Sequence, residues 1–159
     1  MTHVDPALQA TVEAAVARVG PRPGSLLEVL HAVQDELRFV PAAAVPLIAE
    51  ALNLTRAEVH GVLTFYHHFR SQPPGRHVVQ LCRAEACLSM RATELEAHVR
   101  ARLGIDFHGT TADGRITLEP VYCLGNCACA PAMLVDGELH GRVTGELFDA
   151  LLQRWSTAP

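Results

Sequence analysis

The chain has 159 residues, enough for one ordinary domain or for a small domain with a helical extension. Of these residues 49% are hydrophobic and 19% are charged, so the sequence supports a packed core and excludes wholesale disorder. The formal net charge of −4 argues against a nucleic-acid-binding protein.

The N-terminal sequence MTHVDPALQATVEAAVARVG is not typical of a targeting segment. It lacks the basic start and long apolar core of a signal peptide. No apolar run in the chain approaches the length needed to cross a bilayer, so we expect no direct membrane insertion. We therefore expect a soluble, cytoplasmic protein. In that reducing compartment, clustered cysteines more often bind metal or do redox chemistry than form structural disulfides.

Residues 1–72 are predicted to form an N-terminal helical region. A loose helix is expected over residues 6–19, before the breaker GPRPG, and Pro41 opens a later helix. Two stretches fit capping boxes, in which a Ser or Thr and a Glu three residues later cap a helix start: Ser25 with Glu28, and Thr55 with Glu58. Apolar residues recur at helical spacing behind these starts: Leu26, Leu30, Val33 and Leu37; Val45, Ile48 and Leu52; Val59, Val62, Tyr66 and Phe69.

The end of this region, TFYHHF, combines three aromatic residues with two adjacent histidines. We expect Phe65, Tyr66 and Phe69 in the core. His67 and His68 are expected to continue the helix, where adjacent side chains diverge and cannot easily face one ion. A polar helix face or a partner contact is therefore favoured over a metal site.

Residues 73–159 are predicted to form a second domain of α/β class, after the boundary SQPPG. We expect a strand over residues 77–82, a helix over 90–103 and a strand over 115–123. Two further strands within residues 131–143, joined by an Asp-Gly turn, and a helix capped by Thr144 complete the order β-α-β-β-β-α. This order suggests a reduced thioredoxin-like domain.

Four of the five cysteines fall into two pairs on that outline. Cys82 ends the first strand and Cys87 is expected in the loop after it. Cys123 is expected to end the second strand, with Cys127 in the following loop. If the two strands are parallel neighbours, both loops leave the same sheet edge, where sites in such sheets usually lie. The two pairs then converge on one point.

Four thiolates can hold either zinc or an iron–sulfur cluster. A 2Fe–2S cluster has two irons, and one pair per iron is a natural division. The loops are rich in small residues (Ala84, Ala86, Gly125, Ala128 and Ala130), so backbone N–H groups can approach the cluster sulfides. Arg83 could also donate to the cluster. The pattern favours iron–sulfur, with zinc as the alternative.

The motifs CRAEAC and CLGNCACAP resemble those of the thioredoxin-like 2Fe–2S subunit family. The resemblance extends to AEVHGVLTFYHHF and GTTADGRITLEPVYCLGNC, and covers roughly residues 25–150. This family supplies the small 2Fe–2S subunit of NADH:quinone oxidoreductase (respiratory complex I), the gamma subunit of NAD-dependent formate dehydrogenases and a subunit of NAD-linked hydrogenases.

The resemblance implies a helical N-terminal region followed by a thioredoxin-like 2Fe–2S ferredoxin domain with one cluster. It implies Cys82, Cys87, Cys123 and Cys127 as the iron ligands. Cys129 falls where the family has no ligand, and we expect it to pack beside the cluster loop as a small residue.

The resemblance also implies that the chain transfers single electrons next to a flavin- and NAD-binding partner subunit and is not catalytic alone. FMN and NAD are expected on that partner, because this chain has no nucleotide-binding loop pattern. The helices over residues 25–70 are expected to dock on it.

The short chain and the CRAEAC loop look most like the formate dehydrogenase gamma subunit, with further iron–sulfur or molybdenum subunits as partners. The alternatives are the equivalent subunit of complex I or of an NAD-linked hydrogenase. A zinc-stabilised interaction module is the alternative from a different class.

Overall fold

The computed structural model describes residues 5–157 and divides the chain into two compact units, Met1–Pro73 and Pro74–Pro159. We call them the helical unit and the sheet unit. Each has its own hydrophobic core. No helix formed by residues 5–157 combines the length and the apolar character needed to span a membrane.

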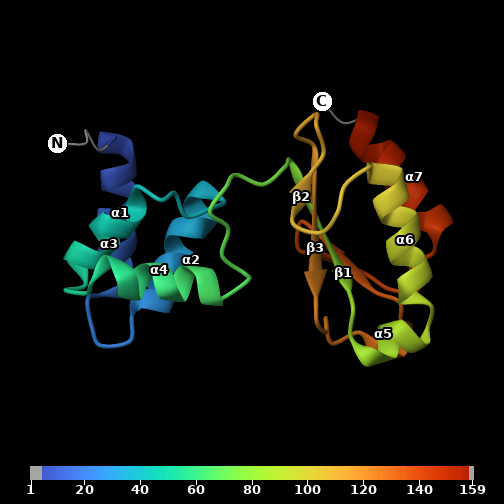
Figure 1. Ribbon diagram of the computed structural model, residues 1–159, viewed down its shortest axis with the longest axis horizontal. Coiled ribbons are helices and arrows are strands. Elements are labelled where there is room, and N and C mark those ends of the chain that lie inside the picture. The colour runs from blue at the N-terminus through green and yellow to red at the C-terminus, as the bar shows by residue number, and fades with distance from the viewer. Residues whose placement is uncertain (1–4, 158–159) are drawn as a thin grey trace. The chain divides into compact units, whose positions relative to one another are not determined.

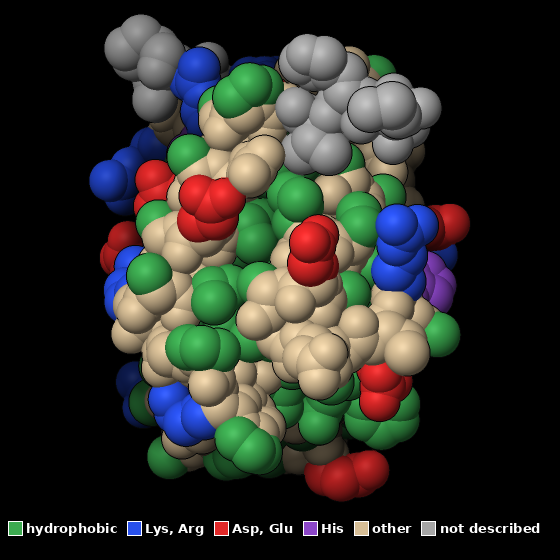
Figure 2. Space-filling model, turned by 90° about the vertical axis from the view of Figure 1, so that its left-hand side faces the viewer, with side chains coloured by type: hydrophobic (Ala, Val, Ile, Leu, Met, Phe, Trp, Pro, Cys, Tyr) green, Lys and Arg blue, Asp and Glu red, His purple; other side chains and the backbone are tan. Residues whose placement is uncertain are grey.

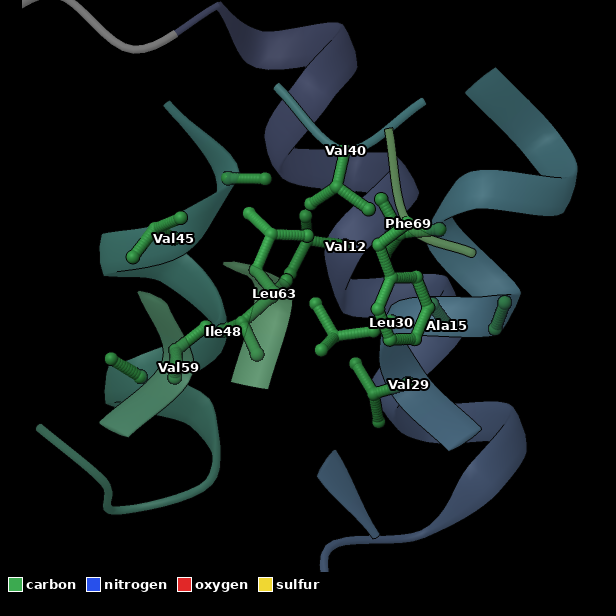
Figure 3. Packing of buried hydrophobic residues seen from close by; sticks show 14 residues of the cluster. Val12, Ala15, Val29, Leu30, Val40, Val45, Ile48, Val59, Leu63 and Phe69 are labelled. Atoms are coloured by element: carbon green, nitrogen blue, oxygen red, sulfur yellow. The ribbon is translucent and has the colours of Figure 1, made fainter. Parts of the chain in front are cut away.

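Over residues 5–73 the helical unit forms four α-helices, which are labelled in Figure 1. They are α1 (Pro6–Val19), α2 (Leu26–Leu37), α3 (Ala44–Ala51) and α4 (Arg56–Phe65). Their apolar faces meet in one core, to which α1 contributes Val12, α2 contributes Leu30 and α3 contributes Ile48 (Figure 3). The outer face drawn in Figure 2 carries acidic and basic side chains interspersed among apolar ones, so that face has no single-sign charge.

The helix starts agree only partly with the sequence analysis. The Thr55–Glu58 capping box is confirmed: Thr55 Oγ accepts from Glu58 N, and the Glu58 carboxylate accepts from Thr55 N. The Ser25–Glu28 box is wrong. Ser25 precedes α2 with αR backbone (φ −70°, ψ −6°) and its side chain makes no capping bond, while the Glu28 carboxylate pairs with Arg22 at 2.6 Å. The helix expected from Pro41 begins three residues later, at Ala44.

The segment TFYHHF also differs from expectation. Helix α4 ends at Phe65, so His67 and His68 lie beyond the helix. Phe69 is buried in the core as expected, but Phe65 and Tyr66 are exposed. The helical periodicity cannot apply past Phe65, because the chain leaves the helix there and turns.

The sheet unit is built on a mixed sheet of five strands with the order β2-β3-β1-β4-β5. Its strands are β1 (His77–Cys82), β2 (Gly109–Thr110), β3 (Ile116–Val121), β4 (Met133–Val135) and β5 (Glu138–His140). The helices are α5 (Glu85–Ser89), α6 (Ala92–Leu103), the short 3₁₀ helix η1 (Cys127–Cys129) and α7 (Gly145–Thr157). The expected α/β class is confirmed. The sequence pattern does not predict the short elements α5, β2 and η1.

Strands β1 and β3 are parallel neighbours, as expected from the helix between them, and the other pairings are antiparallel. Alternate strand residues such as Val79, Leu118 and Met133 face a core that α6 and α7 complete with Val99 and Phe148. Helices α6 and α7 lie on the same side of the sheet in Figure 1. The Asp-Gly turn is confirmed between β4 and β5, with φ of 50° at Asp136 and 90° at Gly137.

Candidate functional site

The four paired cysteines lie at one edge of the sheet, where β1 and β3 end. The parallel register places Cys82, the last residue of β1, opposite Val121, the last residue of β3. Arg83 N then donates to Val121 O at 2.8 Å, which ties the chain leaving β1 to the chain leaving β3. The loops that follow these strands therefore emerge side by side, as the sequence analysis expected.

The first pair, Cys82 and Cys87, is buried. Cys87 lies on α5 and not in a loop as expected, because the chain turns into a helix directly after Ala84. The helix carries Cys87 back toward the strand end, where both sulfurs join a small buried cluster with Ala92, Ala130 and Ala132. The first pair is therefore held by regular structure on both sides.

The second pair, Cys123 and Cys127, is exposed, and its sulfurs lie 4.0 Å apart. Strand β3 ends at Val121, so Cys123 lies in the loop two residues later, not at the strand end. Cys123 has a φ of 113° and Gly125 a φ of 74°, and such left-handed backbone at a non-glycine residue is costly and clusters at functional sites. This turn lets Gly125 N donate to Cys123 Sγ at 3.4 Å.

The sulfur of Cys82 accepts hydrogen bonds from the loops of both pairs. Burial acts to raise the pKa of Cys82, but hydrogen bonds from the backbone N–H groups of Ala84, Leu124 and Cys123 and from the Cys87 thiol outweigh it, so the net pKa is lowered. Two of these N–H donors belong to the loop of the second pair. The fold thus directs backbone N–H dipoles from both loops at the Cys82 sulfur, which favours its ionised form.

Two further thiols, those of Cys87 and Cys127, have raised pKa values because other sulfurs lie close to them. Burial, together with the hydrogen bond and negative charge of Cys82, raises the pKa of Cys87. The hydrogen bond and charge of Cys123, with a further contribution from Cys82, raise the pKa of Cys127. Negative charge on Cys82 or Cys123 therefore opposes ionisation of the other member of its pair, Cys87 or Cys127, which a bound cationic iron centre would relieve.

This donor set fits a two-iron cluster. The sulfurs are arranged as two pairs: Cys123 and Cys127 lie 4.0 Å apart, and the Cys87 thiol hydrogen-bonds the Cys82 sulfur. In a 2Fe–2S cluster each iron takes two protein ligands, which suits one pair per iron. Ala84, Ala130 and Ala132 around the first pair leave room for backbone to approach.

Cys129 lies two residues beyond the second pair and is half-buried. Its backbone is fixed from both sides, because its N–H donates to Asn126 O at 3.0 Å and its carbonyl accepts from Arg142 N at 2.6 Å. Gly141 packs directly on it: a Cβ added there would lie 2.7 Å from Cys129 Cβ and 2.9 Å from Cys129 O. Through these contacts Cys129 packs within the loop of the second pair.

The side chain of Arg83 contacts Glu96 of α6 and the ring of Phe107. Its Nε lies 3.0 Å from the Glu96 carboxylate without the alignment of a hydrogen bond, and its guanidinium stacks 5.2 Å from the Phe107 ring centre. With those partners Arg83 anchors the start of the first cysteine loop to the helix. We found no contact of the guanidinium with the thiols among the described residues.

Sequence reasoning anticipated the four thiols but not their particular N–H donors. Leu124 and Cys123 donate to the Cys82 sulfur across the site, and Ala132 donates to that of Cys87. The available sequence signal was the density of small residues, which predicts close backbone approach without naming the donors.

The fold is that of an α/β protein with two pairs of thiols where its parallel strands β1 and β3 end. The chain belongs to the thioredoxin-like 2Fe–2S ferredoxin family, whose model matches residues 12–156. That family carries a 2Fe–2S cluster.

Named relatives belong to larger enzymes. The chain is 40% identical over 135 residues to a subunit of the NADH-quinone oxidoreductase of Pseudomonas aeruginosa, covering 85% of this chain and 81% of the relative. It is 31% identical over 121 residues to the NADP-reducing hydrogenase subunit HndA of Solidesulfovibrio fructosivorans, covering 76% of this chain and 71% of that one.

A solved structure shows the same arrangement of elements. The NAD⁺-reducing NiFe hydrogenase in its H₂-reduced state superposes with a TM-score of 0.74 and 26% sequence identity. The match covers 88% of this chain but only 24% of the hydrogenase chain. The chain thus corresponds to about a quarter of that longer polypeptide.

Proposed function

We propose that this chain is the one-electron-transfer subunit of an NAD-linked oxidoreductase complex and that Cys82, Cys87, Cys123 and Cys127 hold its 2Fe–2S cluster. The observation that carries the proposal is the convergence of the two pairs at the ends of β1 and β3, with backbone N–H groups of both loops directed at Cys82. Membership of the 2Fe–2S family supports it.

A 2Fe–2S cluster, when bound, accepts and releases electrons one at a time. The protein's part is to hold and orient the ligands. The first pair is fixed by β1 and α5 in a buried, alanine-lined setting, and the second pair is fixed by the turn at Gly125 on an exposed loop. The N–H donors at Cys82 and Cys123 stabilise negative charge on sulfur.

The parent complex we propose is an NADH:quinone oxidoreductase. The short chain and the CRAEAC loop look most like a formate dehydrogenase gamma subunit, but the similar proteins described above are a subunit of a quinone oxidoreductase, a hydrogenase subunit and a chain of a hydrogenase structure. The 40% identity to the Pseudomonas aeruginosa protein favours the quinone oxidoreductase. An NAD-linked hydrogenase is the second candidate, favoured by the structural match.

The partner we propose is a flavin- and NAD-binding subunit of the same complex. In the NAD⁺-reducing hydrogenase, the segment matching this chain is joined to about three quarters of a longer polypeptide, because the match covers 24% of it. A module that is covalently joined to further domains in one enzyme is expected to contact a separate subunit in another.

The cluster assignment is tested on the purified chain by iron and acid-labile sulfide analysis and by the EPR spectrum after reduction. Equal amounts of iron and sulfide, with an axial or rhombic signal, are expected. A Ser substitution at any of the four proposed ligands should remove or perturb the signal, whereas Cys129→Ala, the matched control, should leave it unchanged. A colourless protein with one zinc would overturn the assignment.

The parent complex is tested by affinity purification of the tagged chain from its own host, followed by identification of the co-purifying subunits. Membrane-arm subunits support the quinone oxidoreductase. A NiFe subunit would move the assignment to the hydrogenase, and a molybdenum-binding subunit to formate dehydrogenase.

A further inference from the structure

The helical unit brings together two histidines that lie far apart in the sequence. His31 is on α2 and His68 follows the end of α4, and both are exposed. Their ring centres are 5.1 Å apart, with the ring planes tilted by 42°. Chain order argues against a metal site at His67 and His68, because adjacent side chains diverge. That argument does not apply to His31 and His68, since the fold makes them neighbours.

The ring of Phe69 supports both imidazoles from the side of the core. Phe69 is buried in the core of the helical unit. The His31 ring centre lies 4.9 Å from that of Phe69, and the His68 ring meets Phe69 edge to face at 6.1 Å. Both polar rings thus pack on one buried apolar ring, which restricts how far either can move from the other.

A buried amide fixes the backbone of His68 relative to α2. Gln34 is 4% exposed and lies one turn after His31 on the same helix. Its Nε2 donates to His68 O at 2.9 Å, and its Oε1 accepts from Arg70 N at 2.7 Å. Helix α2 therefore carries one imidazole and also holds the backbone that bears the other. The two rings are preorganised, which lowers the cost of binding a ligand between them.

The separation of the rings suits one metal ion bound by both. Imidazole nitrogens bind Zn²⁺ at about 2.0–2.1 Å, which puts the ion about 3.2 Å from each ring centre. For nitrogen–metal–nitrogen angles of about 90–110°, the ring centres then lie about 4.5–5.2 Å apart. The separation of 5.1 Å falls in this range. The χ2 torsion of histidine is broad, so a small rotation directs one nitrogen of each ring at the ion.

We propose that His31 and His68, here called the histidine pair, bind one divalent ion of the late first-row metals, such as Ni²⁺ or Zn²⁺. Imidazole is a preferred ligand of these ions, whereas Mg²⁺ and Ca²⁺ prefer oxygen. Residues 5–157 gather no third His, Cys, Asp or Glu ligand with the pair, and water completes the coordination at this exposed position.

The bound ion ties α2 to the segment through which the chain leaves the helical unit, just before the boundary at Pro73. The proposal does not depend on the 2Fe–2S cluster, because the four thiols proposed to hold that cluster belong to the sheet unit.

The test is a calorimetric titration of Ni²⁺ into the purified full chain. The chain carries its iron–sulfur cluster, so that the four thiols are occupied, and a tag without histidine. His31→Ala and His68→Ala each remove one ligand. His67→Ala is the matched control, because it removes an exposed histidine directly beside His68. Circular dichroism and the melting temperature without metal show that each variant is folded.

The wild-type chain and His67→Ala are expected to bind one Ni²⁺ with the same affinity. His31→Ala and His68→Ala are each expected to bind it roughly tenfold more weakly or worse, since loss of even an outer-shell partner of a metal ligand costs that much. Ni²⁺ should also raise the melting temperature of the wild-type chain, because it binds the folded state.

A second measurement reads the site without any substitution. Paramagnetic Ni²⁺ should broaden the ring NMR signals of His31 and His68 before that of His98, which lies on α6 of the sheet unit. The proposal is overturned if the wild-type chain binds no Ni²⁺ or if other histidine signals broaden first. It is also overturned if His31→Ala and His68→Ala bind as the wild type does, or if His67→Ala weakens binding as much as they do.

Discussion

The substitution Gly141→Ala tests whether packing behind Cys129 positions the loop of the second pair. The new Cβ would lie 2.7 Å from both Asn126 Nδ2 and Cys129 Cβ, and 2.9 Å from Cys129 O. Carbon atoms in contact prefer about 3.5–4.0 Å, so something must move by roughly 1 Å. The Asn126 amide can swing aside. Cys129 cannot do so easily, because its N–H and its carbonyl are both held by backbone hydrogen bonds.

We expect this overpacking to cost about 1–3 kcal/mol. For a domain of this size, each kcal/mol lowers the melting temperature by about 4–8 °C. Trp155 is the chain's single tryptophan and packs against Phe148 and His77 in the sheet unit, so its fluorescence reports the melting of that unit. Because the loop carries the second pair, the reduced EPR signal should also change.

The matched control is Gly61→Ala, the same chemical change at a site where no atom lies within 4 Å. It should leave both the Trp155 transition and the EPR signal unchanged. If Gly141→Ala melts less than about 4 °C below the wild-type chain, the shift expected for 1 kcal/mol, the packing argument fails. An unchanged EPR signal in a destabilised variant would show that the loop relaxes without moving its thiols.

Three other features make separate predictions. In cluster-free protein, iodoacetamide should modify the exposed second pair before the buried first pair, as read by peptide mass spectrometry; equal rates would contradict the burial. Thr55→Ala should cost about 1 kcal/mol in urea unfolding followed by circular dichroism, because an N-cap is lost. Ser25→Ala should cost nothing in the same assay, because Ser25 Oγ is buried with no hydrogen-bond partner among the described residues. Hydrogen bonds from the Thr111 hydroxyl and the Arg115 backbone and side chain lower the pKa of Asp113 from 3.8 to about 2. A carboxylate with a lowered folded pKa stabilises the fold above its unfolded pKa, and this contribution is lost as the pH falls from about 3.8 through about 2. An NMR titration should show this pKa, and a midpoint near 3.8 would contradict the contacts.

The sequence predicted those parts of the fold that depend on local pattern and chain order. The helix over Pro6–Val19 and the Asp136–Gly137 turn follow from residue types alone, and the parallel pairing of β1 with β3 follows from the helix between them. The convergence of the cysteine loops follows in turn from that pairing.

The errors arose where a second contact competes with a local pattern or where a segment is too short to show one. Ser25 and Glu28 have capping-box spacing, but Arg22, six residues before Glu28, takes the carboxylate. Cys87 was expected in a loop because five residues are too few to show helical periodicity. Tyr66 lies at helical spacing behind Val59 and Val62, but periodicity does not extend past the end of α4, and it cannot distinguish a core face from an exposed apolar face.

The Asp136 carboxylate acts at the end of the sheet opposite the thiols. It accepts from Val78 N at 2.8 Å and lies 2.6 Å from His77 Nδ1, so the β4–β5 turn is fastened to the start of β1. At the other end of this short ladder, Cys82 N donates to Ala132 O at 3.1 Å. A one-residue slip of β4 along β1 would break the Asp136 contacts and the hydrogen bond from Cys82 N to Ala132 O. It would also turn Met133 and Val135 out of the core. The alignment of the chain that returns from the second pair is thus set partly by a carboxylate that never approaches a sulfur.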